Sequence, residues 1–323
     1  MKKVYKHDER TFAILRILSD ETDPDHFLSL PALMARLEET GIHSERKAIY
    51  RSVHALKTAG FDVRFVRRKP LSGYYLSRPF SPSEILLLRQ LVSDSVSLSQ
   101  KESETIRNKL DRLISPYEKE LLPPSIDAEG KTDNTEVLAT LEKTVRAIAS
   151  RHLLEFRYYD LSITRRKQYR KNNRLYRLLP CAVVSNAGRL YAVFYSPKYQ
   201  NFANYRLDKM STVQESQEVC DPISFDAKRW IQRSFQMYTG EAATVTLDCD
   251  SSLISQIYDQ FGTDLIISRV ETDWFTVSIK TSLTPTLIAW ILTFYDRITV
   301  RKPQELIDQL RRISDDINQR YPI

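Results

Sequence analysis

The sequence predicts an α+β protein that is divided into several domains, and three observations support this prediction. The chain has 323 residues, which is more than one hydrophobic core usually organises. Hydrophobic residues make up 42% of it, enough to bury more than one core. Helical and strand periodicities succeed one another in separate blocks. We expect four parts, which comprise residues 1–80, 81–135, 136–220 and 221–323.

The first part predicts three helices and a β-hairpin. Apolar residues recur every three or four positions over 12–18, which indicates an amphipathic helix. A second helix is expected over 29–41, and a third over 44–59 with Ser44 as its cap. Residues 61–66 alternate with period two, and the strand pattern returns at 74–76 after a turn. This order of elements is the plan of a winged helix-turn-helix.

The second part predicts a helical linker. Ser81 and Glu84 have the spacing of a capping box, with a proline at the first helical position, and a leucine-rich helix follows them. Another helix is expected over 101–114. The polar stretch 123–134 contains helix-breaking residues and should form an irregular connection.

The last two parts predict mixed structures. A helix over 136–150 precedes short strand-like runs that suggest a small, strongly curved antiparallel sheet. These runs cover residues 153–159, 175–184, 190–195 and 204–207. From about residue 241 the elements follow the order β-α-β-β-α-β, which is the ferredoxin-like order, and a final amphipathic helix starts after Pro303.

Positive charge is concentrated in two segments of the chain. Residues 44–69 contain eight Lys and Arg against two acidic residues, and residues 165–177 contain seven Lys and Arg and no acidic residue. The whole chain carries only +7, so the remainder is net negative. Two basic segments are typical of a protein that meets phosphate groups at two places, although a basic run can also be a solvated surface.

One face of the predicted helix 44–59 suits a DNA groove. Ile49, Val53 and Leu56 form a stripe that should be buried. The polar residues on the other side are Arg46, Lys47, Tyr50, Arg51 and His54. Arginine and lysine can reach phosphates or guanine edges, and a tyrosine hydroxyl can bond a phosphate. The alternative is an ordinary surface helix with incidental charge.

A basic corner lies between the two predicted hairpin strands. A recognition helix followed by such a corner has the order of contacts expected of a winged helix on DNA. We therefore predict a DNA-binding surface composed of Ser44, Arg46, Lys47, Tyr50, Arg51, His54, Arg67, Arg68 and Lys69.

The segment from Ser44 to Leu56, with Gly60 and the later Gly73-Tyr74-Tyr75-Leu76, resembles the helix-turn-helix of the DeoR-like and WYL regulators. Their helix usually has a serine followed by Arg-Thr-(Val/Ile)-Tyr-Arg-Asp. Tyr50 and Arg51 are kept here, whereas other residues replace the usual Arg, Thr and Asp. These are Lys47, Ala48 and Ser52.

The middle of the chain resembles the WYL domain, a small Sm-like β-barrel. The matching features are an aromatic first strand, the step Arg177-Leu178-Leu179-Pro180, the run Gly188-Arg189-Leu190-Tyr191-Ala192 and the ending Arg206-Leu207-Asp208-Lys209-Met210. Of the tripeptide that gives the family its name, only Tyr191 is kept, and Lys209-Met210 stands where the family usually has Arg-Ile. The preceding winged helix and the following ferredoxin-like segment, the WYL extension domain, complete the resemblance over nearly the whole chain.

In this family the WYL domain is taken to sense a ligand, often a nucleic acid or nucleotide, through basic and aromatic residues. The resemblance implies a ligand site at Tyr158, Arg177, Arg189, Tyr191, Tyr205, Arg206 and Lys209. Arginine suits phosphates and aromatic faces suit bases. The basic run 165–174, which connects the first two predicted strands, is alternatively a mobile, solvated loop.

Catalytic and cofactor signatures are absent from the sequence. The seven glycines form no phosphate-binding loop, and the five histidines have no metal-ligand spacing. The three cysteines are far apart, and no run of about 18 uncharged apolar residues occurs. We therefore expect a cytoplasmic protein that is not an enzyme and that has no cofactor, bound metal, disulfide framework or membrane span.

These observations predict a transcription regulator that binds operator DNA, as a homodimer, and responds to a nucleotide or single-stranded nucleic acid. The dimer is expected from the symmetry of typical operators. An alternative is an RNA- or single-strand-binding accessory protein that uses the curved sheet as its main contact. A third reading is a scaffold protein that does not contact nucleic acid.

Overall fold

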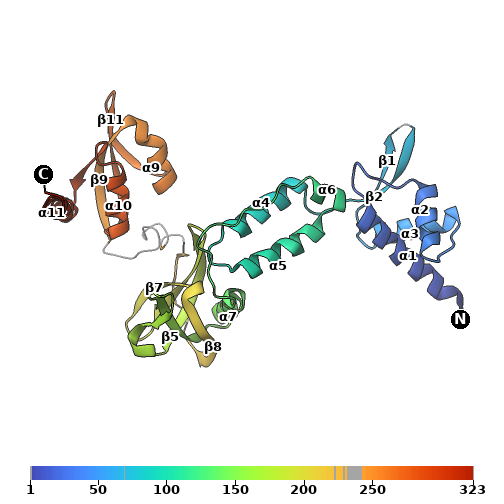
Figure 1. Ribbon diagram of the computed structural model, residues 1–323, viewed down its shortest axis with the longest axis horizontal. Coiled ribbons are helices and arrows are strands. Elements are labelled where there is room, and N and C mark those ends of the chain that lie inside the picture. Colours follow the sequence, from blue (N-terminus) through green and yellow to red (C-terminus); the bar gives the residue numbers. More distant parts are fainter. Residues whose placement is uncertain (1, 69, 222, 228–229, 231–241, 323) are drawn as a thin grey trace. The chain divides into compact units, whose positions relative to one another are not determined.

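The computed structural model describes residues 2–68, 70–221, 223–227, 230 and 242–322. The chain has a mixed α/β fold and divides into two compact units, residues 1–135 and 136–323 (Figure 1). Within the described residues, no helix has both the length and the apolar character that crossing a membrane requires.

The N-terminal unit begins with three helices and a two-stranded antiparallel hairpin, as expected. The elements are α1 (Lys2–Glu21), α2 (Leu30–Glu39), α3 (Arg46–Thr58), β1 (Val63–Arg68) and β2 (Leu71–Leu76). Ile14, Leu33 and Ile49, one from each helix, are fully buried in one core. The hairpin joins this core because the peptide groups of Leu28 and Tyr74 exchange backbone hydrogen bonds of 3.0 and 2.8 Å. We call residues 2–80 the head.

The cap of α3 differs from the prediction. Glu45 occupies the N-cap position in an extended conformation, with φ −79° and ψ 155°, and its side chain makes no capping bond. Ser44 lies one residue too early to cap the helix, and its buried hydroxyl has no hydrogen-bond partner among the described residues. The first turn of α3 therefore contains Arg46 and Lys47 without a side-chain cap.

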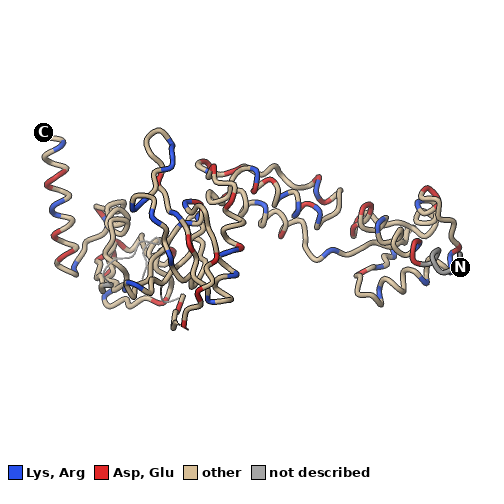
Figure 2. Tube along the Cα trace, turned by 90° about the horizontal axis from the view of Figure 1, so that it is seen from below, with Lys and Arg blue, Asp and Glu red and all other residues tan. Residues whose placement is uncertain are grey.

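Three successive capping boxes organise the linker that follows the head. The helices are α4 (Pro82–Asp94), α5 (Gln100–Leu110) and α6 (Pro116–Glu120). The predicted box of Ser81 and Glu84 is confirmed, and Ser99 and Ser115 begin the other two. Helix α5 ends earlier than expected, and the five-residue helix α6 was not predicted because it has no room for a periodic pattern. Basic and acidic residues mix along α4 and α5 (Figure 2).

The second unit starts with α7 (Val137–Ser150) and a curved, antiparallel six-stranded sheet. Its strands are β3 (His152–Leu161), β4 (Lys167–Tyr169), β5 (Tyr176–Asn186), β6 (Arg189–Ser196), β7 (Asn201–Arg206) and β8 (Met210–Val219). The order is β4-β3-β5-β6-β7, and β8 also pairs with β3. Register shifts interrupt the β3–β8 and β5–β6 pairings, which bends and twists the strands.

Two strands of this sheet were missed at the sequence level. β4 is three residues long and lies inside the basic run that was expected to connect two strands. β8 has a largely exposed, polar second half, so it lacks the alternation that identifies a half-buried strand. Both strands pair with β3, which contains Tyr158.

The remaining described residues form a four-stranded sheet with helices. The elements are β9 (Ala242–Asp250), α9 (Ile254–Phe261), β10 (Ile266–Val270), β11 (Trp274–Ser282), α10 (Pro285–Thr293), β12 (Ile298–Lys302) and α11 (Gln304–Arg320). The order of elements is the predicted one, and the strand order is β10-β11-β9-β12 with antiparallel pairs throughout. Val245, Leu247 and Cys249 alternate into the core, where Cys249 is buried as a packing residue.

Candidate nucleic-acid interfaces

Helix α3 exposes a polar face on the side opposite its core contacts. Ile49, Val53 and Leu56 are at most 4% exposed. Five residues, which we call the recognition face, are exposed: Arg46, Lys47, Tyr50, Arg51 and His54. Tyr50 is 51% exposed, so its ring and hydroxyl are accessible on this face. The structure therefore brings the helical part of the predicted DNA surface together.

The recognition face is strongly positive. Among the described residues, the ion pairs involve none of Arg46, Lys47 and Arg51. Arg10 of α1 adds another cation nearby, because its Nε donates to the Ser52 hydroxyl of α3 at 3.0 Å. Burial, and then repulsion from Arg51, lower the pKa of Arg10 below its ordinary value. Sequence patterns within one helix could not identify Arg10, since only the packing of α1 on α3 places it there.

A surface cleft of about 500 Å³ separates the recognition face from the hairpin. Tyr50, Phe65 and Arg67 line it, together with the N-terminal residues of α2. The Arg67 guanidinium lies 5.9 Å from the centre of the Phe65 ring, which itself packs at 4.9 Å on Tyr74. The hairpin side of the cleft therefore combines the cation Arg67 with the exposed Phe65, which was not among the predicted DNA-binding residues.

The remaining predicted DNA-binding residues are placed less favourably. Arg68 forms an ion pair of 2.9 Å with Asp25, although both side chains are largely exposed. The Ser44 hydroxyl is buried, so it does not reach the surface in this structure. Lys69 lies outside the described residues.

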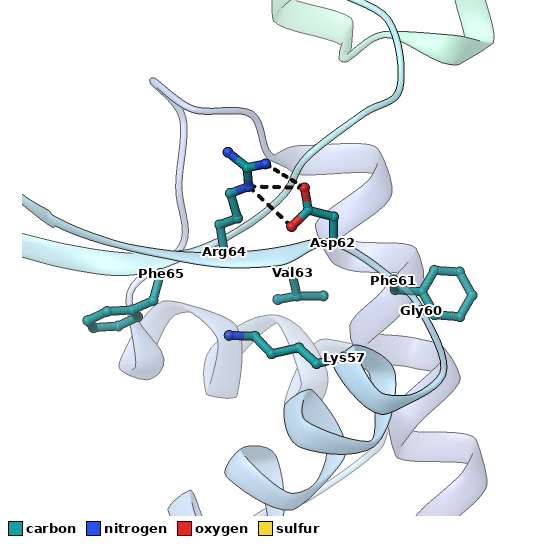
Figure 3. Close-up of a pocket in the computed structure, with 7 residues that line it drawn as sticks. All are labelled: Lys57, Gly60, Phe61, Asp62, Val63, Arg64 and Phe65. Carbon is teal, nitrogen blue, oxygen red and sulfur yellow. Dashed lines mark hydrogen bonds and ion pairs between the residues drawn. The ribbon is translucent and has the colours of Figure 1, made fainter.

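A second hollow, of about 670 Å³, lies at the corner between α3 and β1. Figure 3 shows Arg64 paired with Asp62 above Val63, with Phe61 and Phe65 at opposite ends. The Arg64 Nη2 lies 2.8 Å from the Asp62 carboxylate, and this pairing lowers the pKa of Asp62. The carboxylate neutralises Arg64, so Lys57 is the other cation that lines this hollow.

Gly73 fixes the position of the hairpin. A Cβ at this residue would lie 2.3 Å from the carbonyl oxygen of Leu28 and 2.5 Å from its carbonyl carbon. Both are backbone atoms that cannot rotate away, so only glycine allows β2 to approach residue 28 this closely. The position of the hairpin beside the helices therefore depends on an uncharged residue.

Five aromatic residues meet inside the curved sheet. This aromatic cluster comprises Phe156, Tyr158, Tyr176, Phe194 and Tyr205, with ring centroids 5.1 to 6.3 Å apart. The Tyr158 hydroxyl accepts a hydrogen bond of 3.2 Å from the backbone N–H of Arg206. Burial raises the pKa of Tyr158 and of Tyr205 to about 12, so both phenols stay neutral.

Three of the four cations implied by the resemblance, Arg177, Arg206 and Lys209, are held by carboxylates. Arg206 forms an ion pair with buried Asp208, and Lys209 Nζ lies 2.6 Å from Asp160. Arg206 is the cross-strand neighbour of Tyr191, and its backbone N–H contacts Tyr158, which packs on Tyr205. These four residues therefore lie in one region of the sheet. Arg189 lies two residues before Tyr191, at the start of β6 and next to the β5–β6 hairpin turn.

Arg177 is separated from the aromatic cluster. It follows Tyr176 on β5, and successive side chains of a strand point to opposite faces. Its guanidinium instead contacts Glu155 at 3.2 Å and Glu218 at 2.6 Å. The structure therefore places Arg177 outside the group formed by the other candidates.

Three basic residues lie over aromatic rings of this domain and were not among the predicted ligand residues. Lys167 lies 4.7 Å from the centre of the Tyr159 ring, Arg170 lies 5.1 Å from that of Tyr158 and Lys171 lies 4.6 Å from that of Tyr176. The signal that could have identified them is the basic run itself. Its position over aromatic rings depends on the unpredicted pairing of β4 with β3.

Comparison with known proteins assigns two domains to the second unit. Residues 139–215 match the WYL domain and residues 241–317 match the WCX domain. No curated protein is significantly similar in sequence. Among solved structures, proteasome accessory factor B/C (PafBC) of Arthrobacter aurescens matches with 17% identity over 95% of this chain and a TM-score of 0.27. The chain spans 46% of the length of that protein. The second unit therefore contains a WYL domain and a WCX domain.

Proposed function

We propose that the chain is a DNA-binding transcription regulator whose WYL domain senses a ligand. In this proposal the head is a winged helix-turn-helix, residues 81–135 are its helical linker and the curved sheet is an Sm-like barrel. The final sheet and its helices form a ferredoxin-like domain, for which the strand order β10-β11-β9-β12 provides support. The proposed role is binding rather than catalysis, without a cofactor.

The observation that carries the proposal is the recognition face. An α-helix fits the major groove of B-DNA, where arginine and lysine reach guanine edges and phosphates. Here the basic and aromatic side chains of α3 point away from the core, and Arg67 of the hairpin lines the adjoining cleft. A helix and a hairpin that present cations side by side can hold the duplex at two points.

The proposed ligand contains bases and phosphates. The aromatic cluster supplies ring faces, and Arg206 and Lys209 supply cations beside it. Ligand binding would change operator affinity if the ligand prefers one arrangement of two heads in a dimer over another. The alternative function, RNA or single-strand binding as an accessory protein, is favoured by the same cluster and does not need the recognition face.

Genome-wide footprinting of the full chain tests the proposal by locating its operator, and duplex binding then compares three proteins. Arg51→Ala should weaken specific duplex binding about 100-fold, whereas Arg206→Ala should keep it and lose the ligand response. If Arg206→Ala removes all nucleic-acid binding, the accessory-protein alternative is correct. If the wild-type chain shows no salt-dependent nucleic-acid binding, the scaffold reading is correct.

A further inference from the structure

The basic segment between β3 and β5 covers the aromatic cluster. We call residues 167–173 the basic lid. Arg170 lies over the Tyr158 ring, and Lys171 lies over the Tyr176 ring, at the distances given above. Tyr158 is only 6% exposed and Tyr176 only 7%. The ring faces on which a base would stack are therefore occupied by the protein's own cations.

One carboxylate holds the lid in place. Asp160 Oδ2 accepts a hydrogen bond of 2.6 Å from Arg170 Nε, and its Oδ1 accepts one of 2.6 Å from Lys209 Nζ. The bond from Arg170 is the main reason that the pKa of Asp160 lies below its ordinary value. Asp160 thus occupies the position between two cations that a phosphate would be expected to take.

The backbone of the lid adopts an unfavourable conformation. Lys171, Asn172 and Asn173 have φ values of 50°, 51° and 64°, which places three successive residues in the left-handed region. This region is disfavoured for residues with a Cβ, more so for lysine than for asparagine. The closed lid therefore depends on its side-chain contacts, and a ligand that replaces those contacts can open it.

We propose that the lid is an internal competitor of the ligand, and that Asp160 sets the affinity of the site. When the ligand binds, Arg170 leaves Asp160 and the Tyr158 ring, and Lys171 leaves the Tyr176 ring. Both cations then pair with phosphates, and a base stacks on the ring face that they have exposed. The ligand is a base joined to phosphate, either as a free nucleotide or within a single strand. This inference rests on the proposed ligand-sensing function of the WYL domain.

Fluorescence anisotropy with the full chain tests this proposal by measuring the Kd for two labelled probes, an oligothymidylate of about twelve nucleotides and a mononucleotide. Asp160→Asn should lower Kd about threefold to tenfold, because it removes an ion pair and a repulsive charge but keeps the cations. The double variant Arg170→Ala, Lys171→Ala should bind at least about tenfold more weakly. Asp259→Asn, an exposed residue of α9, makes the same change of net charge and should stay within about twofold of wild type.

The possible outcomes separate the lid from the function on which it rests. Tighter binding of only one probe by Asp160→Asn supports the lid and identifies the source of the ligand. If the wild type binds a probe and Asp160→Asn matches Asp259→Asn, the lid is overturned and ligand sensing stands. If the wild type binds neither probe, ligand sensing fails for these two chemistries. In that case, amide hydrogen exchange at residues 170–174 tests whether Asp160 holds the lid closed. Asp160→Asn should accelerate this exchange several-fold, and an exchange rate equal to that of the wild type would overturn the proposal.

Discussion

The recognition face and the proposed ligand site of the WYL domain, which we call the WYL site, are both basic, but their cations have different partners. On α3, the cations Arg46, Lys47 and Arg51 point outward and form no ion pair among the described residues. In the curved sheet, Arg170 and Lys209 share Asp160, and Arg206 is paired with Asp208. The cations of the first surface are available to attract a phosphate backbone from a distance, whereas a ligand of the second would have to replace the carboxylates before it could bind the cations. Charge counts alone do not distinguish these two designs.

The largest effect is expected at the recognition face. Arg51→Ala should weaken binding to the operator duplex about 100-fold if the guanidinium contacts a guanine edge, since such a contact is worth about 1–3 kcal/mol. The matched control is Arg64→Ala, also in the head, whose guanidinium is already paired with Asp62. Equal losses of affinity for both variants, measured by anisotropy, would show that the head binds through diffuse charge rather than through this face.

A change without charge should also disable the head while leaving the WYL site intact. Gly73→Ala places a methyl group against the backbone of Leu28, and such overpacking costs about 1–3 kcal/mol. We expect a lower free energy of unfolding for the N-terminal unit and weaker duplex binding, with unchanged ligand binding. Chemical denaturation with probes in each unit can measure this. A stability equal to that of the wild type would mean that β2 moves away at no cost.

Acid should destabilise the head through Asp23. Burial alone would raise the pKa of this carboxyl, but hydrogen bonds from the Ser115 hydroxyl and from His26 outweigh burial and hold it below its ordinary value. Because the folded-state pKa is lowered, the stabilisation is present above the unfolded-state pKa of about 3.8 and is lost as pH falls through the folded-state value. Asp23→Asn should lower the free energy of unfolding at neutral pH by about 1–3 kcal/mol.

The loss of stability in Asp23→Asn should shrink as pH falls below about 4, since the wild-type carboxylate also becomes protonated there. Thermal unfolding of both proteins between pH 2 and pH 7 measures this. A difference in Tm that is the same at every pH would show that the carboxylate charge does not contribute.

The smallest effect is expected at the hairpin. Arg67→Ala should weaken binding equally for all duplex sequences. It should also make the negative slope of log K against log salt shallower by about 1, which corresponds to the loss of one phosphate contact. Titrations at several salt concentrations with operator and unrelated duplexes check this. If the loss depends on sequence, Arg67 reads bases rather than positioning the backbone.

Much of the fold could be predicted because periodicity and capping are local properties. The three helices and hairpin of the head, the capping box at Ser81 and the order of elements in the last domain all follow from spacings within a few residues. The exceptions are also local in cause. Helix α6 and strand β4 are too short for a pattern, and β8 is too exposed to alternate. Ser44 failed as a cap because the start of α3 shifted by one residue.

The candidate sites were predictable only in part. The recognition face of α3 follows from a helical wheel, since one helix determines which residues share its surface. The contacts of Arg10 with Ser52 and of Arg170 with Tyr158 each join two different elements. No pattern within one element can therefore reveal them. The carboxylates Asp160 and Asp208 were also not predicted as partners, because a basic run gives no sign of the acids that fold against it.

The hydrogen bond between Asp23 and Ser115 has a consequence for protein engineering. At 2.7 Å, with both residues buried, it makes the cap of α6 part of the same packed unit as the first two helices of the head. His26 adds to this junction by stacking on Tyr117, with ring centroids 3.9 Å apart. A chimaera that exchanges the head should therefore be joined near residue 135, where the N-terminal unit ends, rather than at residue 80. A junction at residue 80 would separate the Asp23 carboxylate from the Ser115 hydroxyl, and His26 from Tyr117. The grafted head would then lose its contacts with α6.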